Sequence, residues 1–167
     1  MTVATEPAVR DARPPDVGVR VTNLIVRPLL CTPVARLFTP LALLEFKGRR
    51  SGDQRRIVVG WHVIGDVGFV VTPARWRANF IGGHPTTVHR RGTSMALVGR
   101  LVNDPAAVAS AINQLLDSGT SARSLALHIP QGHVIDSEDV VATDRALIRF
   151  DPASVRMAKF PYGVNST

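Results

Sequence analysis

Between residues 41 and 102 the chain alternates short apolar runs with glycine-containing turns. The runs over 41–47, 56–64 and 67–72 are rich in valine, isoleucine and leucine, and the dipeptide Gly65-Asp66 between the last two is typical of a tight hairpin. Strands linked by such short turns pair as antiparallel neighbours. The pattern therefore predicts a β meander at the centre of the fold.

The same pattern continues further along the chain. Strands are predicted over 86–91 and 94–102, joined around Gly92, and an apolar run over 145–150 predicts a last strand. About six antiparallel strands with few helices predict an α+β fold. Closing such a sheet into a small barrel would remove its exposed edges.

Helical signals are fewer. Residues 73–82 carry helical spacing and end at two glycines, which predicts a short helix or turn. Asp104 and Pro105 suit the N-cap and first position of an amphipathic helix. A weaker pattern over 121–128 predicts one more short helix.

The length of 167 residues and the hydrophobic content of 45% allow one sizeable core. We therefore expect a single domain over 21–152. Residues 1–20 mix charged residues with prolines and contain no apolar run, so they predict a disordered tail and no secretory signal. Residues 153–167 are expected to form a C-terminal tail.

Residues 21–46 are strongly apolar, but Arg27, Arg36 and several prolines interrupt them, which argues against a membrane-spanning helix. The segment predicts an N-terminal amphipathic helix over 21–40. Two interpretations stay open. The helix packs against the domain or caps a cavity, or it rests on lipid as a peripheral membrane contact through 21–46, with its arginines facing phosphates.

The sequence lacks the residue patterns of several common kinds of site. Cys31 is the only cysteine, which excludes an internal disulfide and fits a reducing cytoplasm. His62, His84 and His89 lack the spacing of metal ligands, so no metal is expected. Ser51 lies outside a Gly-x-Ser-x-Gly frame, and the chain has no Walker or Rossmann glycine pattern.

Positive charge is concentrated in one stretch. Residues 47–100 hold ten basic residues against only Asp53 and Asp66, so they carry +8, whereas the whole chain carries +7. The densest part contains Gly48, Arg49, Arg50, Ser51, Gly52, Arg55 and Arg56. A glycine-hinged turn flanked by guanidinium groups supplies backbone N–H donors and bidentate forks, which suits a phosphate or carboxylate. The alternative is a solvated basic turn.

This turn is followed by two strand patterns, then by Trp76-Arg77-Ala78-Asn79 and by Pro85. In this order the chain resembles the deazaflavin-dependent nitroreductase family of split-barrel oxidoreductases. The resemblance covers residues 21–102, with a weaker match at 144–152. It implies a split β-barrel with an N-terminal helix and one or two further helices.

The resemblance also implies a coenzyme, a reduced 8-hydroxy-5-deazaflavin, with FMN as the alternative. The glycine–arginine turn and Arg55 would hold its phosphate and acidic tail, strand 57–61 would lie along its ring, and 76–79 would lie near the pocket. The implied cofactor-binding residues are Gly48, Arg49, Arg50, Ser51, Gly52, Arg55, Arg56, Val58, Trp76 and Asn79.

Catalytic residues are not identified by this resemblance. His128 and His133 are candidates because a loop histidine can protonate a substrate near neutral pH. The alternative is that both are exposed polar loop residues. Tyr162 is a further candidate, since it is the only tyrosine and family members carry a tyrosine-rich stretch late in the chain.

The expected function is a deazaflavin-dependent oxidoreductase that transfers a hydride to a planar electron-poor acceptor, either quinone-like or nitroaromatic. The alternative is a non-catalytic or FMN-using cofactor-binding protein of the same barrel class. A nucleic-acid binder ranks last, because two Trp, one Tyr and six Phe leave few aromatics for a stacking platform. The expected partners are thus a coenzyme and a small-molecule substrate, and the sequence leaves a homodimer open.

Overall fold

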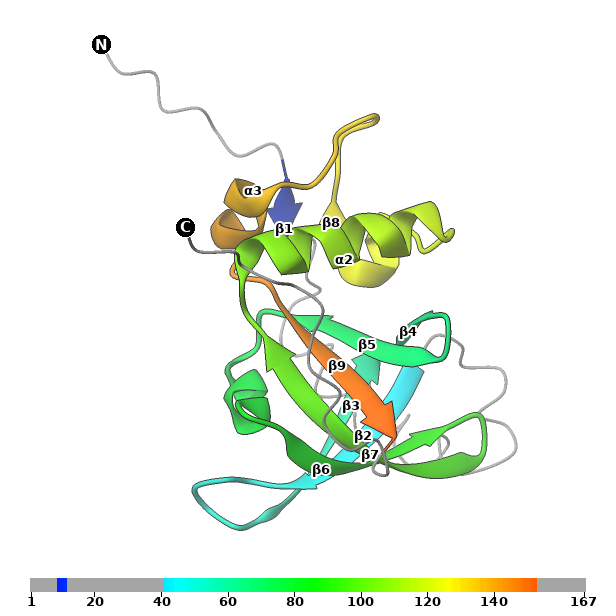
Figure 1. The fold of residues 1–167 in the computed structure, drawn as a ribbon, viewed down its shortest axis with the longest axis vertical. Helices are drawn as coiled ribbons and strands as arrows, with labels where there is room; N and C mark the ends of the chain where they lie inside the picture. The colour runs from blue at the N-terminus through cyan, green and yellow to red at the C-terminus, as the bar shows by residue number, and fades with distance from the viewer. Residues whose placement is uncertain (1–8, 12–40, 153–167) are drawn as a thin grey trace, which may run out of the picture.

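The computed structural model describes residues 9–11 and 41–152 (Figure 1). Seven strands form one antiparallel sheet in the spatial order β3-β2-β6-β7-β9-β5-β4. Their bounds are β2 (Leu41–Lys47), β3 (Gln54–Gly60), β4 (His62–Ile64), β5 (Val67–Thr72), β6 (His84–Arg90), β7 (Thr93–Val102) and β9 (Ala146–Pro152). The predicted strands 41–47 and 67–72 are confirmed at both ends.

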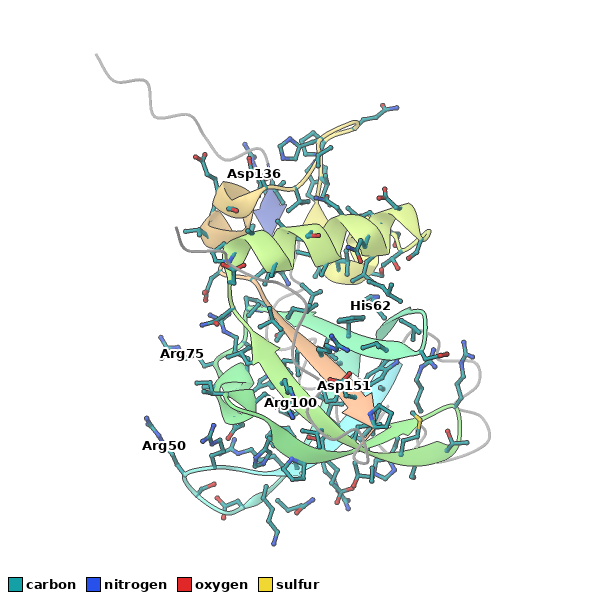
Figure 2. The ribbon with its side chains drawn as sticks, viewed as in Figure 1. Arg50, His62, Arg75, Arg100, Asp136 and Asp151 are labelled. Carbon is teal, nitrogen blue, oxygen red and sulfur yellow. The ribbon has the colours of Figure 1, made fainter. Side chains whose placement is uncertain are left out.

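The structure contains the 3-10 helices η2 (Arg75–Phe80) and η3 (Ala122–Leu125) and the α-helices α2 (Pro105–Asp117) and α3 (Ser137–Ala142). The helices α2, α3 and η3 lie together at one end of the sheet, whereas η2 packs against the barrel core. Asp104 caps α2 as predicted, since its side chain accepts a hydrogen bond from the Ala107 amide at 2.9 Å. Asp136, at the start of α3 (Figure 2), accepts from the amides of Glu138 and Asp139. None of the helices in the described ranges is long and apolar enough to cross a membrane.

The sheet curls because its two edge strands are consecutive in the chain. β3 and β4 lie at opposite ends of the strand order, yet only Trp61 separates them. The single strand expected over 56–64 is therefore wrong: the chain leaves one edge and joins the other at Trp61. The Trp61 side chain is 4% exposed, and its ring centroid lies 5.0 Å from that of Phe150. Burial of this ring inside the barrel stabilises the crossing from β3 to β4. The predicted α+β split-barrel-like fold is confirmed.

The inner face of the sheet forms one hydrophobic core. Its buried members are Ala42, Leu44, Phe46, Val59, Trp61, Val70, Phe80, Val88, Ile148 and Phe150. Two glycines make room for the largest rings. A Cβ on Gly68 would lie 1.9 Å from an atom of the Trp61 ring, and one on Gly99 would lie 2.5 Å from the Phe80 ring. The barrel interior is therefore filled by aromatic side chains that pack directly on the backbone of glycines.

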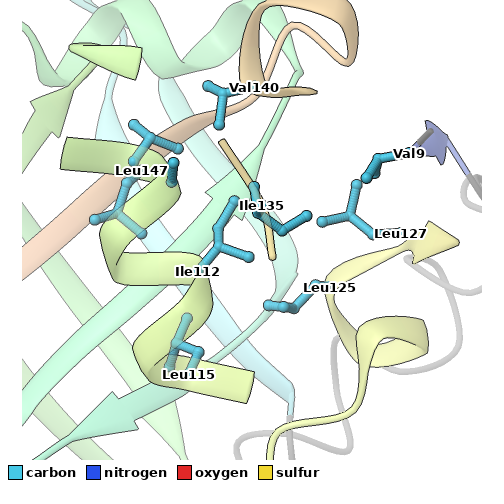
Figure 3. Packing of buried hydrophobic residues seen from close by; sticks show 10 residues of the cluster. Val9, Ile112, Leu115, Leu125, Leu127, Ile135, Val140 and Leu147 are labelled. Carbon is cyan, nitrogen blue, oxygen red and sulfur yellow. The ribbon is translucent and has the colours of Figure 1, made fainter. Parts of the chain in front are cut away.

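A second core lies between the helices and the outer face of the sheet (Figure 3). Ile112 and Leu115 of α2 pack there with Leu125 and Leu127. Val9 is 2% exposed in the same cluster, next to β1 (Arg10–Asp11), which pairs with β8 (Leu127–His128).

Several sequence expectations fall on the termini. Residues 9–11 belong to the segment that we expect to form a disordered tail. In the structure Arg10 and Asp11 pair with β8, and Val9 is buried. The rest of that tail, the helix expected over 21–40 and the tail over 153–167 lie outside the described residues.

His62 lies on β4 beneath α2, between the barrel and the helical layer (Figure 2). The residue is 6% exposed, and burial lowers the pKa of its imidazole from 6.5 to about 4. The folded protein therefore holds His62 neutral at a pH where the unfolded chain protonates it.

This difference predicts acid sensitivity. The contribution of neutral His62 to stability is fully present above pH 6.5 and is lost as the pH falls toward 4. We expect the free energy of unfolding to fall by about 2 kcal/mol between pH 7 and pH 5 from this group alone. Urea denaturation at both pH values measures it. His62→Gln should remove that part of the pH dependence, and an unchanged pH dependence in this variant would contradict the assignment.

Candidate functional site: an arginine-lined cavity

The link between β2 and β3 is a closed turn. The Gly48 amide donates to the Asp53 carbonyl at 2.8 Å, and the Gly52 amide donates to the Gly48 carbonyl at 2.8 Å. Gly52 has a φ of 71°, which only glycine adopts without strain. Within the described residues, the amides of Arg50 and Ser51 donate no hydrogen bond. Two adjacent backbone donors are thus left for a ligand or water.

Gly48 is required by a close approach rather than by its backbone angle. A Cβ at this position would lie 2.7 Å from the Ser51 hydroxyl oxygen and 3.0 Å from Nε of Arg55. Without that Cβ, the hydroxyl and the guanidinium group both pack over the backbone of Gly48. The glycine therefore brings two polar side chains to one side of the turn.

Asn79 ties this turn to η2. Its Oδ1 accepts a hydrogen bond from the Arg49 amide at 2.9 Å, and its Nδ2 donates to the Trp76 carbonyl at 2.7 Å. The guanidinium group of Arg49 also donates to the Ile81 carbonyl at the end of the helix. Both polar ends of Asn79 are used within the protein, so this side chain positions the turn.

A cavity of about 730 Å³ lies between the turn and η2, within the range of about 300–1,000 Å³ common for small-molecule sites. Its lining consists of Gly48, Arg49, Arg50, Ser51, Arg55, Arg75, Trp76, Ala78, Asn79 and Ile81. Four of these residues are arginines and none is acidic. Arg50 and Arg75 come from different elements but lie on the same side of the barrel (Figure 2).

The arginines of the cavity differ from others nearby in having no carboxylate partner. Within the described residues, Arg50, Arg55 and Arg75 form no ion pair. By contrast, Arg77 on the same helix donates to a carboxylate oxygen of Asp144 at 2.6 Å. The uncompensated positive charge of the cavity favours an anionic ligand.

Trp76, Ala78 and Ile81 give the cavity an apolar side. Trp76 is half-buried, with its ring centroid 6.3 Å from Phe46 and 5.9 Å from Phe80. It therefore anchors η2 on the barrel core and also lines the cavity. Apolar and cationic surfaces side by side suit a ligand with a planar apolar part and an anionic part.

The structure brings together seven of the ten residues proposed from the sequence for a cofactor, since the lining holds Gly48, Arg49, Arg50, Ser51, Arg55, Trp76 and Asn79. Gly52 shapes the turn behind it. Arg56 and Val58 alternate with Arg55 along β3, so they point to the opposite face of the sheet, where Arg56 binds Glu45.

Arg75, Ala78 and Ile81 were missed by the sequence reasoning, although they line the cavity. Arg75 belongs to the basic stretch that the charge count identified, but nothing in its immediate sequence sets it apart from Arg77. Its place in the cavity depends on how η2 docks against the turn.

The candidate catalytic histidines lie elsewhere. His128 is exposed on β8, opposite Arg10. His133 places its Nε2 2.6 Å from a carboxylate oxygen of Asp139, next to α3. Neither lines the cavity, and Tyr162 is outside the described residues. Within the described ranges, no group of three or more His, Cys, Asp or Glu residues could hold a metal ion.

A scan against protein-family models finds no match for the chain, and a search of curated proteins finds no relative. Among solved structures, a chain described as a domain-swapped dimer is 13% identical, with a TM-score of 0.48, over 83% of this chain and 100% of its own. The FAD and heme binding protein from Mycobacterium smegmatis is 16% identical, with a TM-score of 0.35, over 84% of this chain and 91% of its own. At these values neither structure transfers a ligand or an activity to this chain.

Proposed function

We propose that the chain is a deazaflavin-dependent oxidoreductase that passes a hydride from the reduced coenzyme to a planar electron-poor acceptor, quinone-like or nitroaromatic. The observation that carries this proposal is the cavity, whose described lining residues include four arginines and a tryptophan and no acid. The order of motifs in the sequence, which resembles that family, supports a deazaflavin as the coenzyme. The size and the lining of the cavity support binding at this site.

The residues present fit the anionic part of such a coenzyme. The free amides of Arg50 and Ser51 and the unpaired guanidinium groups of Arg50, Arg55 and Arg75 are all donors without acceptors of their own. Phosphate and carboxylate oxygens are acceptors that such donors bind strongly. We therefore assign these residues to the phosphate and the acidic tail, and Trp76 and Ile81 to the apolar ring.

When bound, the reduced coenzyme would supply the hydride, while the protein supplies position and electrostatics. Arg50, Arg55 and Arg75 fix the anionic end, which orients the attached ring. Trp76 and Ile81 exclude water from the apolar side.

Two alternatives share the cavity. FMN also combines a planar ring with a phosphate, and a carrier that binds a coenzyme without turnover needs no acceptor site. The cavity fits a nucleic-acid binder less well, because the arginines of such a protein would line an open groove along the backbone of the nucleic acid. Here they converge on one cavity beside a turn and a short helix.

The function is tested by mixing the reduced deazaflavin with a quinone or a nitroaromatic in the absence of oxygen. Oxidation of the coenzyme is followed by absorbance, with and without the full chain. Faster oxidation with the protein supports the enzyme. If the coenzyme binds but neither acceptor is reduced faster, the protein is a carrier. If FMN binds and the deazaflavin does not, the coenzyme assignment is wrong.

The positioning role of Asn79 gives a separate prediction. Asn79→Ala removes two hydrogen bonds, so we expect a loss of about 2 kcal/mol in the free energy of unfolding. Coenzyme binding should weaken by about tenfold, because the turn would hold its binding conformation for less of the time. Chemical denaturation and a fluorescence titration measure the two effects.

Asn113 offers a matched control. Its Nδ2 donates to the Ile135 carbonyl at 2.8 Å and its Oδ1 accepts from the Ile135 amide at 3.1 Å, away from the cavity. Asn113→Ala should therefore lower stability to a similar extent without affecting coenzyme binding. Equal weakening of binding in both variants would show that Asn79 acts through global stability alone.

A further inference from the structure

A row of hydrogen-bonded side chains crosses four strands on the outer face of the sheet. Nη2 of Arg56 donates to Oε1 of Glu45 at 3.0 Å. Oε2 of Glu45 lies 3.0 Å from Nε2 of His89, and Nδ1 of His89 lies 2.7 Å from the Ser94 hydroxyl oxygen. Glu45 alternates with Leu44 and Phe46 of the barrel core, so the row faces away from the interior.

The charge of Glu45 fixes the direction of these hydrogen bonds. The hydrogen bond from Arg56 lowers the pKa of Glu45, against the opposing effect of burial, and His89 and Gln54 lower it further. A carboxylate only accepts, so Nε2 of His89 must carry the proton that it donates to Glu45. In neutral His89 the lone pair is then on Nδ1, which accepts the hydrogen bond from the Ser94 hydroxyl.

We propose that Ser94 is a reactive nucleophile, with His89 as its general base and Glu45 as the residue that orients His89. A serine hydroxyl, an imidazole that takes its proton and a carboxylate that holds the imidazole are the parts that nucleophilic acyl transfer requires. The two ring nitrogens exchange their usual roles, with Nδ1 toward the serine. This inference does not depend on the coenzyme, because none of the three residues lines the cavity.

The exposure of the row suits this role. The side chains of Glu45 and His89 are 20% and 16% exposed, so the base and the residue that orients it are mostly shielded from water. Ser94 itself is exposed. The reacting oxygen is therefore accessible to a molecule in solution, while the groups behind it are held in place.

The sheet register holds the three side chains together. His89 pairs directly with Ser94 across β6 and β7, and Glu45 pairs with Arg56 across β2 and β3. His89 is the partner of Leu43 on β2, two residues from Glu45. Paired and diagonal positions on one face of a sheet are within reach of long side chains. The pairing of the strands therefore fixes the relative positions of Glu45, His89 and Ser94.

The donor class is an activated acyl compound, such as a thioester or an acyl phosphate, which brings its own good leaving group. Oγ of Ser94 would attack the carbonyl carbon while its proton passes to Nδ1 of His89. The bond to the leaving group breaks, and the leaving group departs with the electron pair and takes the proton from His89. The products are an ester on Ser94 and the free thiol or phosphate.

A fluorophosphonate reagent tests this reactivity on the full chain. Attack by Oγ of Ser94 on phosphorus would expel fluoride and leave a covalent adduct, which mass spectrometry of the intact protein and of its peptides locates. Ser110 is an internal reference, since it is an exposed serine on α2 hydrogen-bonded to Gln114. We expect Ser94 to be labelled about 100-fold faster than Ser110, as general-base assistance provides.

Variants separate the roles in the row. His89→Gln should abolish this advantage over Ser110, and Glu45→Gln should reduce it while leaving the serine and the base in place. His62→Gln is the matched control, a histidine change outside the row that should label as the natural chain does. Circular dichroism checks that each variant is folded. Labelling of Ser94 no faster than Ser110, or unchanged in folded His89→Gln and Glu45→Gln, would overturn the proposal.

Discussion

Replacing Arg55 with alanine should weaken binding of the deazaflavin coenzyme by about 10- to 100-fold, the worth of one hydrogen bond to a charged group. Arg55 lies against Gly48 in the cavity and has no ion-pair partner among the described residues. Its guanidinium group is therefore available to an anion, and no internal contact of that kind is lost with it. Titration followed by coenzyme fluorescence measures the dissociation constant.

The control for Arg55 is Arg123→Ala. Arg123 is an exposed arginine on η3 and does not line the cavity. Removing it lowers the net charge of the protein by the same amount, so it tests whether general electrostatic attraction explains binding. We expect it to bind the coenzyme as the natural chain does. If both variants lose affinity equally, the arginines act through net charge and the cavity is not the site.

Replacing Gly68 with alanine should lower the free energy of unfolding by at least about 3 kcal/mol, the upper part of the range for overpacked cores. The added Cβ would lie 1.9 Å from the Trp61 ring, so either the indole or the strand must move. Trp61 is the residue at which the chain passes from one edge of the sheet to the other. Moving its ring therefore strains the closure of the barrel, and urea denaturation measures the loss.

A double-mutant cycle identifies the cause of that loss. Trp61→Leu removes the ring and destabilises the protein by leaving a cavity. In this background Gly68→Ala should cost much less than in the natural chain, because the clash is gone. If the cost of Gly68→Ala is the same in both backgrounds, the effect comes from the strand backbone, and Trp61 does not determine it.

The sequence predicts most of the strands because their signals are local. The runs 41–47 and 67–72 are apolar and each is followed by a turn or a break, and they match β2 and β5. In β5 buried and half-buried positions alternate, whereas β2 is buried over residues 42–44. The break at Trp61 could not be predicted in this way. Its neighbours on both sides have strand character, and only the spatial order of seven strands shows that β3 and β4 occupy opposite edges.

The candidate site was partly predictable for a related reason. The turn from Gly48 to Gly52 and the nearby Arg55 form one dense motif, so its chemistry is visible in the sequence. Arg75 belongs to the cavity only because Asn79 holds η2 against that turn, across 30 residues of sequence. Such a contact leaves no local pattern.

The row of side chains on the outer face was even less predictable from the sequence. Glu45 and His89 are 44 residues apart, and their contact depends on the register of β2 against β6. A shift of one residue in that register would move His89 to the other face of the sheet. Sequence spacing alone therefore suggests no relation between Glu45, His89 and Ser94.

We propose that the arginine-lined cavity holds a deazaflavin coenzyme. A fluorescence titration of the full chain with that coenzyme, in parallel with FMN and NADPH, tests it most directly. We predict saturable binding of the deazaflavin in the micromolar range, tighter than either of the other two. Binding no tighter than millimolar for all three would show that the cavity is not a coenzyme site.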